Sequence, residues 1–134
     1  MRKFGHLTIL VNDYDEALEF YTAKLGFIKK SDNQFGKGNR WLTVAPPDQT
    51  DLEIIFVKAD TTEKQAIVGK QASDHVFLTL QTDDCQRDFK MMKEKGVRFL
   101  GEPAEQFYGT EVVFEDLYGN RFDLIQVAEG PHDE

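Results

Sequence analysis

The sequence has a single cysteine, only four prolines and no apolar run long enough to span a bilayer. One thiol, Cys85, cannot form an internal disulfide. The first residues, Met1 to His6, lead directly into an alternating apolar stretch and contain neither the apolar core nor the cleavage site of a signal peptide. These absences argue against a disulfide-rich secreted fold and predict a cytoplasmic protein with no membrane partner.

Positive charge is also scarce. The chain carries 16 basic and 24 acidic residues, which gives a net charge of −8. Binding to nucleic acid requires a clustered positive surface, and the basic runs Lys29-Lys30 and Lys90 to Lys95 are short. The sequence therefore predicts no nucleic-acid partner. The acidic balance favours solubility, and a cationic ligand is the alternative interpretation.

What the sequence does contain is an internal repeat. A strand-like stretch that begins at His6 recurs at His75, 69 positions later, and the glycine that closes the following helix-like stretch recurs 70 positions later, at Gly26 and Gly96. The 134 residues fit a single domain made of two similar modules. The expected boundaries are module 1 at about 1–58, a linker at about 59–74, module 2 at about 75–127 and a tail at 128–134.

The sequence pattern of each module predicts one strand, one helix and three further strands. Asp13 and Asp83 are the expected helix N-caps, and Cys85 is expected on the apolar face of the second helix, as a core residue. The pattern predicts an α+β fold in which two tandem βαβββ modules form a cupped mixed sheet. The later strands are expected at about 28–35, 39–45 and 52–58, and again at about 97–101, 110–115 and 121–127.

Alternation along the first strand of each module separates an apolar face from a mixed one. Leu7, Ile9 and Val11 should pack on the first helix, as Val76, Leu78 and Leu80 should pack on the second. The mixed faces are expected to line a pocket for a small molecule. The candidate pocket residues are Thr8, Trp41, Phe77 and Tyr108, although residues placed like Trp41 and Tyr108 more often serve in core or edge packing than in ligand contact.

The repeat also places two histidines and two carboxylates in matching positions. His6 and His75 begin equivalent strands, and Glu53 and Asp123 occupy equivalent places in the last strand of each module. If the mixed faces converge, these four side chains form a ligand set suited to a divalent Ni, Zn, Fe, Mn or Co ion. Taken singly, each of them is more typical of a solvent-facing residue.

Nearly the whole chain resembles the vicinal oxygen chelate superfamily, which includes glyoxalases, bleomycin-resistance proteins and extradiol dioxygenases. The resemblance rests on His6, the helix ending at Gly26-Phe27, the "LEI" around Glu53, His75 and the segment Tyr118 to Leu124. It places His6, Glu53, His75 and Asp123 on the metal-ligand positions of the glyoxalase I branch. Asp123 stands where metal-dependent members usually carry glutamate.

The resemblance implies two functions that the sequence leaves open. One is a metal-dependent enzyme of the lyase, isomerase or dioxygenase type, in which the metal polarises adjacent substrate oxygens and Glu53 or Asp123 is the catalytic base. The other is a metal-free protein that binds or sequesters a small molecule, as in the bleomycin-resistance branch. A homodimer is expected by resemblance in either case.

Overall fold

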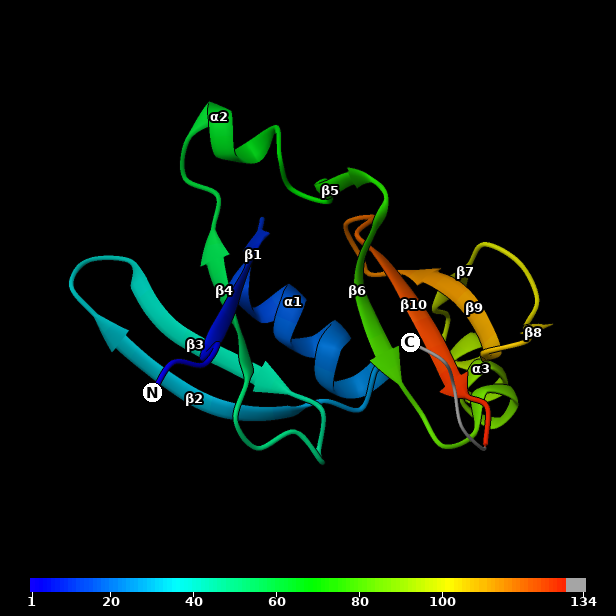
Figure 1. Ribbon diagram of the computed structural model, residues 1–134. Helices are drawn as coiled ribbons and strands as arrows, with labels where there is room; N and C mark the ends of the chain where they lie inside the picture. The colour runs from blue at the N-terminus through cyan, green and yellow to red at the C-terminus, as the bar shows by residue number, and fades with distance from the viewer. Residues whose placement is uncertain (130–134) are drawn as a thin grey trace. The chain divides into compact units, whose positions relative to one another are not determined.

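Two mixed sheets, one in each half of the chain, organise the computed structural model, which describes residues 1–129 (Figure 1). The chain divides into unit 1, Met1–Gln71, and unit 2, which begins at Ala72. The expected α+β class with two tandem modules is confirmed, and hydrogen bonding separates the strands into two sheets. Within the described range, no helix has the length and apolar character needed to cross a membrane.

Unit 1 forms a four-stranded sheet in the order β1-β4-β3-β2. The first and last strands, β1 and β4, pair in parallel, and the other pairs are antiparallel. A continuous helical segment between β1 and β2 begins as α-helix and ends as a π-helical turn. The bounds are β1 His6–Val11, α1 Tyr14–Glu19, η1 Phe20–Lys24, β2 Ile28–Phe35, β3 Asn39–Ala45 and β4 Glu53–Lys58.

The helix of unit 1 begins and ends where the sequence predicts. Asp13 is the N-cap, and its side chain accepts a hydrogen bond of 3.2 Å from the backbone N–H of Glu16. Gly26, just beyond the helix, has a φ of 74°, a left-handed conformation that favours glycine. Ile9 and Val11 are fully buried, which confirms the apolar face of β1.

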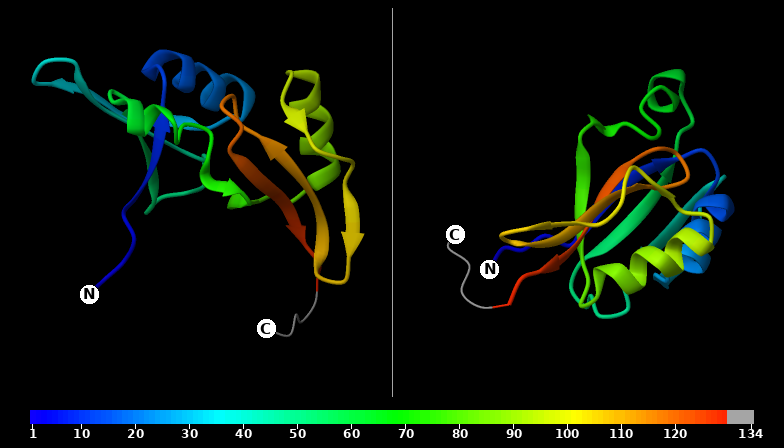
Figure 2. Two further views of the ribbon diagram at one scale, coloured as in Figure 1. Left: turned by 90° about the horizontal axis from the view of Figure 1, so that it is seen from above. Right: turned by 90° about the vertical axis from the view of Figure 1, so that its right-hand side faces the viewer.

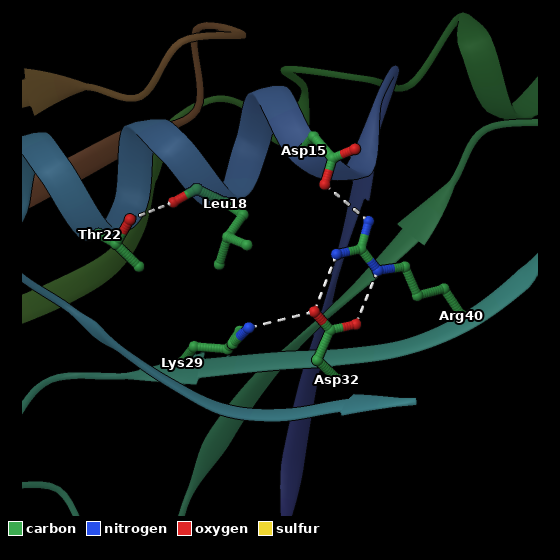
Figure 3. Close-up of polar contacts among 6 residues, drawn as sticks. All are labelled: Asp15, Leu18, Thr22, Lys29, Asp32 and Arg40. Atoms are coloured by element: carbon green, nitrogen blue, oxygen red, sulfur yellow. Dashed lines mark hydrogen bonds and ion pairs between the residues drawn. The ribbon is translucent and has the colours of Figure 1, made fainter. Parts of the chain in front are cut away.

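One arginine connects the helix of unit 1 to its sheet (Figure 3). Arg40 on β3 donates from Nε and NH2 to the two oxygens of Asp32 on β2, at 2.8 and 2.9 Å. Its NH1 donates to Asp15 in the first turn of α1, also at 2.8 Å. The Arg40 guanidinium lowers the pKa of Asp32 to about 2. Lys29 adds a more exposed ion pair to Asp32, at 3.3 Å.

The segment expected to be a linker has secondary structure of its own. It contains α2 (Thr62–Gln65) and β5 (Gln71–Asp74). The Gln71 side chain accepts a hydrogen bond from the Leu10 backbone N–H at 2.8 Å and donates to the Thr8 carbonyl at 3.2 Å. β1 is an edge strand and pairs with β4 on one side only. The Gln71 side chain therefore satisfies backbone groups on the other, unpaired side of β1.

Unit 2 repeats the topology of unit 1. Its strands run in the order β6-β10-β9-β7, with β8 paired to β9, and the first and last strands, β6 and β10, are again parallel. Figure 2 shows α3 lying along one face of the orange and red strands β9 and β10. The bounds are β6 Val76–Gln81, α3 Cys85–Glu94, β7 Arg98–Phe99, β8 Ala104–Gln106, β9 Gly109–Glu115 and β10 Arg121–Val127.

The core of unit 2 is aromatic. Phe114 and Phe122 stack with ring centroids 5.1 Å apart, and Phe89 of α3 meets Phe99 edge to face at 4.7 Å. Cys85 is fully buried as expected, and burial raises the pKa of its thiol. The expected cap of α3 was wrong by one residue: Asp84 is the N-cap and accepts from the Arg87 N–H at 3.0 Å, whereas Asp83 forms an ion pair with the Arg87 guanidinium.

A buried aspartate shapes the turn that leads into β10. Asp116 is only 5% exposed, and its Oδ1 accepts from the backbone N–H groups of Tyr118 and Asn120, each at 2.9 Å. Its Oδ2 accepts from the Asn120 side chain, also at 2.9 Å. The turn sets the register in which Arg121 lies opposite Glu115 and Asp123 lies opposite Val113.

Candidate functional site

Unit 1 places a histidine and a carboxylate side by side. His6 on β1 pairs directly with Glu53 on β4, and His6 Nε2 lies 3.9 Å from Glu53 Oε1. The Trp41 ring meets the His6 ring edge to face, with centroids 5.2 Å apart. Thr8, two residues further along β1, is exposed and lies opposite Ile55. Because His6, Thr8, Glu53 and Ile55 alternate with buried apolar residues, they share the face of the sheet away from the core.

Unit 2 does not reproduce this pair. Asp123 on β10 lies opposite Thr79 of β6, and His75 precedes β6 altogether. The register of the β6–β10 pairing is the reason, because Arg121 already lies opposite Val76, beyond His75. The next residue, Phe122, lies opposite Leu78, so β6 contains one extra residue, which moves Asp123 one position further along β6.

The same bulge overturns one expectation about β6. Val76 was expected to pack against the second helix together with Leu78 and Leu80, but it lies before the bulge, and its side chain is 39% exposed. Phe77 is the extra residue, and its half-buried ring meets the core residue Phe122 edge to face at 6.4 Å. Strict alternation fails here because a bulge changes which residues share a face.

Three polar side chains form a connected group on β9 and β10. Tyr108, just before β9, donates its hydroxyl hydrogen bond to Glu111 Oε2, which raises the pKa of Tyr108. Burial, hydrogen bonding with Glu111 and the charge of Glu111 raise the pKa of the neighbouring Asp123 to about 7. Among the described residues no donor reaches the buried Oδ1 of Asp123.

Glu111 and Asp123 line a pocket of about 550 Å³ that belongs to unit 2. We call it the unit 2 pocket. It lies on the face of β9 and β10 that carries Glu111, Val113, Arg121 and Asp123, whereas Phe114, Phe122 and Leu124 are buried in the core. Its apolar lining includes Val76, Leu100 and Val113. The ionisable residues that line it are Asp74, His75, Glu102, Glu111, Arg121 and Asp123.

Within each unit the structure brings two of the four predicted metal ligands near each other. His6 and Glu53 form one group with Trp41, and His75 and Asp123 both line the unit 2 pocket. Tyr108 donates to the pocket residue Glu111 but does not itself line the pocket. Glu111 and Arg121 were not singled out from the sequence. Alternation along 111, 113 and 115 and along 121, 123 and 125 is the signal that places them on the face of Asp123.

The donor chemistry fits a divalent metal in unit 1 better than in unit 2. Imidazole and carboxylate lie within one ion's reach of each other at His6 and Glu53. In unit 2, the neighbour of Asp123 across the strands is the Thr79 hydroxyl, and the Asp123 carboxyl is already in contact with Glu111. Within the described part of either unit, no three His, Cys, Asp or Glu side chains are grouped so as to hold a metal ion.

This chain matches one protein-family model, and its sequence is similar to proteins of two bacteria. The model of the Glyoxalase/Bleomycin resistance protein/Dioxygenase superfamily matches residues 3–124. A protein of Shewanella frigidimarina (strain NCIMB 400) is 44% identical over 125 residues, which are 92% of this chain and 93% of that protein. YurT of Bacillus subtilis (strain 168) is 40% identical over 121 residues, which are 89% of this chain and 94% of YurT.

Solved structures agree with the sequence comparisons. The crystal structure of UcmS2 is 34% identical with a TM-score of 0.82, and the match covers 93% of this chain and 98% of UcmS2. TnmS3, an antibiotic binding protein from Streptomyces sp. CB03234, is 29% identical with a TM-score of 0.75, and the match covers 96% and 98% of the two chains. This chain therefore belongs to the glyoxalase/bleomycin resistance protein/dioxygenase superfamily.

Proposed function

We propose that this protein binds a small organic molecule in the unit 2 pocket, without a metal ion and without transforming the molecule. The observation that carries the proposal is the pocket itself. Its volume of about 550 Å³ is in the range of small-molecule sites, and its lining combines apolar side chains with a few convergent polar groups. The likeness to TnmS3, which is described as an antibiotic binding protein, supports binding rather than turnover.

The polar groups of the pocket also favour recognition over metal chemistry. Glu111 accepts a hydrogen bond from the Tyr108 hydroxyl, so its carboxylate is held in place by the chain itself. Polar groups that are fixed before the ligand arrives lose little conformational entropy on binding. This arrangement suits a site that orients a ligand through hydrogen bonds.

Binding in this pocket can be tested by methyl NMR of metal-free protein against a library of small drug-like compounds. Ligands should shift the methyl resonances of Val76, Leu100 and Val113, which line the pocket, and leave those of the unit 1 core residue Leu42 in place. Absence of such shifts across the library, or shifts that require an added divalent metal, would contradict the proposal.

A matched pair of substitutions places the binding in the pocket. Val113→Lys fills the pocket from β9 and should abolish the shifts. Val127→Lys adds the same charge at an exposed position of β10, outside the lining, and should preserve them. Equal loss in both variants would mean that charge or stability, rather than the pocket, controls binding.

A second candidate function keeps the metal, and the observation that favours it is the pairing of His6 with Glu53 at 3.9 Å. Here we propose that a divalent ion held by His6, Glu53, His75 and Asp123 would supply Lewis-acid chemistry to a substrate with adjacent oxygens. Titration of wild type, His6→Ala and His75→Ala with Ni, Zn, Mn, Fe and Co tests it. Stoichiometric binding that both substitutions abolish supports this function, and no stoichiometric binding by folded wild type excludes it.

A further inference from the structure

Carboxyl groups dominate the charge of the unit 2 pocket. The charged residues that line it are four acids and one arginine, namely Asp74, Glu102, Glu111, Asp123 and Arg121. Their ion-pair neighbours Glu115, Arg98 and Lys93 do not reverse the balance, since five carboxyl groups then stand against three Lys and Arg side chains. The lining therefore favours positive charge inside the pocket.

The one arginine of the lining already has partners within unit 2. Arg121 Nε lies 3.8 Å from Glu115 Oε2, and Arg121 NH1 donates to the carbonyl oxygen of Asp74 at 2.6 Å. The Glu115 carboxylate does not line the pocket, so it offsets the guanidinium charge without taking part in the lining. A ligand therefore meets an arginine whose charge and donors are partly used by the chain.

The acidic residues of the lining are compensated less. Glu102 Oε2 lies 4.0 Å from Lys93 Nζ, and the two side chains are 80% and 59% exposed, so this ion pair is weak. Glu111 accepts from the Tyr108 hydroxyl, which is an uncharged donor. Within residues 1–129, no Lys or Arg side chain forms an ion pair with the Asp74 or Glu111 carboxylate.

One acidic side chain of the lining also lacks hydrogen bonds that a carboxylate normally makes. Asp123 Oδ1 is buried, and no donor of the described residues reaches it. A carboxylate that is shielded from water and has an unbonded oxygen costs free energy, and a cation beside it offsets that cost. This observation does not depend on counting acidic residues, and the excess of carboxyl groups remains when Asp123 is left out of the count.

The missing cation is better supplied by an organic molecule than by a metal ion. No three His, Cys, Asp or Glu side chains in the described part of unit 2 are grouped so as to hold a metal. Carboxyl groups spread over a pocket create a negative potential rather than a coordination sphere. Val76 and Leu100 also line the pocket and are 39% and 42% exposed, and covering them would remove apolar surface from water.

We propose that the unit 2 pocket selects organic cations, that is, molecules with an apolar body and a protonated amine. The amine lies among the acidic residues and the apolar body covers Val76 and Leu100. The proposal rests on the small-molecule binding function proposed above and names the chemical class of the ligand. The net charge of −8 of the whole chain favours the approach of the same molecules.

Calorimetric titration of metal-free full-length protein tests the selectivity with matched probes. Naphthylmethylamine is compared with naphthylmethanol, which has the same ring system and no charge, and with the anion naphthoate. At low ionic strength we expect the amine to bind roughly tenfold more tightly than the alcohol, and the preference should shrink as salt is added. Calcium chloride at matched ionic strength should not displace the amine.

Paired substitutions locate the preference in the pocket. Asp74→Asn combined with Glu111→Gln removes two charges from the lining, and it keeps the Asp74 carbonyl and an acceptor for Tyr108. This double variant should lose the preference for the amine. Glu94→Gln combined with Glu105→Gln removes the same charge from exposed positions outside the lining and should preserve the preference. Circular dichroism checks that both double variants are folded.

The outcomes separate this inference from the proposed function. If the alcohol binds as tightly as the amine and shifts the Val113 and Leu100 methyl resonances, the pocket binds small molecules but the cation selectivity is wrong. The inference alone also fails if neutral or anionic compounds bind and no amine does. Equal losses in the two double variants would show a bulk charge effect, and displacement of the amine by calcium would show a metal site. If neither the probes nor the compound library bind, both proposals fail.

Discussion

Asp123 lies opposite Thr79 in the parallel pairing of β10 with β6, whereas Glu53, its counterpart in the repeat, lies opposite His6. The two units share a topology, but the side chain facing the carboxyl group is a hydroxyl in one and an imidazole in the other. Imidazole is a common ligand of transition metals and threonine is not. The repeat therefore preserves the scaffold of unit 1 in unit 2 while changing the chemistry at this position.

Restoring the imidazole should restore metal affinity. Thr79→His combined with Glu111→Gln places a histidine opposite Asp123 and removes the carboxyl group that contacts it. Calorimetry should show nickel binding strengthened by roughly tenfold, or about 1.4 kcal/mol, over wild type. Gln81→His with the same Glu111→Gln change is the control, because that histidine lies opposite Ile125. A similar gain in the control would contradict the interpretation of the register.

Arg40 should contribute more to the stability of unit 1 than Lys29, although both side chains contact Asp32. Arg40→Gln removes two hydrogen bonds to Asp32 and one to Asp15, and the Arg40 side chain is only 17% exposed. We expect the free energy of unfolding to fall by about 1.5–3 kcal/mol. Lys29→Gln removes one exposed contact to the same Asp32 and should cost about 0.5 kcal/mol or less. Urea denaturation measures both, and equal losses would be inconsistent with the geometry.

Asp32 should make stability depend on pH in the acid range. Hydrogen bonds and ion pairs from Arg40 lower its pKa from 3.8 to about 2 in the folded protein. A lowered folded-state pKa stabilises the fold above the unfolded pKa, and this contribution is lost as the pH falls towards the folded value. The stability difference between wild type and Asp32→Asn should therefore be constant above about pH 5 and shrink by about 1–2 kcal/mol between pH 4 and 2. A difference that stays constant down to pH 2 would refute the pairing.

The turn before β10 should depend on Asp116. Asp116→Ala leaves the buried Asn120 side chain and two backbone N–H groups without their acceptor. The expected loss of stability is about 2–4 kcal/mol by thermal or urea denaturation. Asp51→Ala, an exposed position in the corresponding turn before β4, should change stability by about 0.5 kcal/mol or less. A small effect at Asp116 would show that the turn forms without its carboxylate.

Gly109, at the start of β9, should tolerate no side chain. Its φ is 149°, and a Cβ atom there would lie 2.2 Å from the backbone oxygen of Gln126. Gly109→Ala should therefore destabilise the protein by about 3 kcal/mol or more, because backbone has to move. Gly101→Ala, where a Cβ atom meets nothing within 4 Å, is the matched control. Comparable melting temperatures for the two variants would contradict the close approach of β9 and β10.

Much of the fold could be predicted because local patterns and the repeat agree. Alternation predicted β2 and β3 at their observed bounds, and Asp13 and Gly26 marked the ends of the first helix. The errors arose where one residue was inserted. The cap of α3 moved to Asp84, and the bulge at Phe77 turned Val76 towards the pocket. The extra residue before α3 and the extra residue in β6 both leave the apolar pattern almost unchanged, so a single sequence does not reveal either of them.

The site was less predictable because it depends on contacts between strands. The repeat pointed to His6 and Glu53, and the structure places them side by side. It could not show that Glu111 contacts Asp123, since the diagonal neighbours across β9 and β10 depend on the register set by the Asp116 turn. Metal binding by the four predicted residues, the homodimer and the cytoplasmic location stay predictions.

Calorimetric titration of one pocket ligand under two conditions tests the central claim most directly. The same protein is titrated in EDTA and again after saturation with nickel, with metal content measured before each run. Binding in the unit 2 pocket without a metal predicts one ligand per chain and the same dissociation constant in both conditions. Binding that appears only with one equivalent of nickel, and that His6→Ala abolishes, would contradict the account and favour the metal-dependent function.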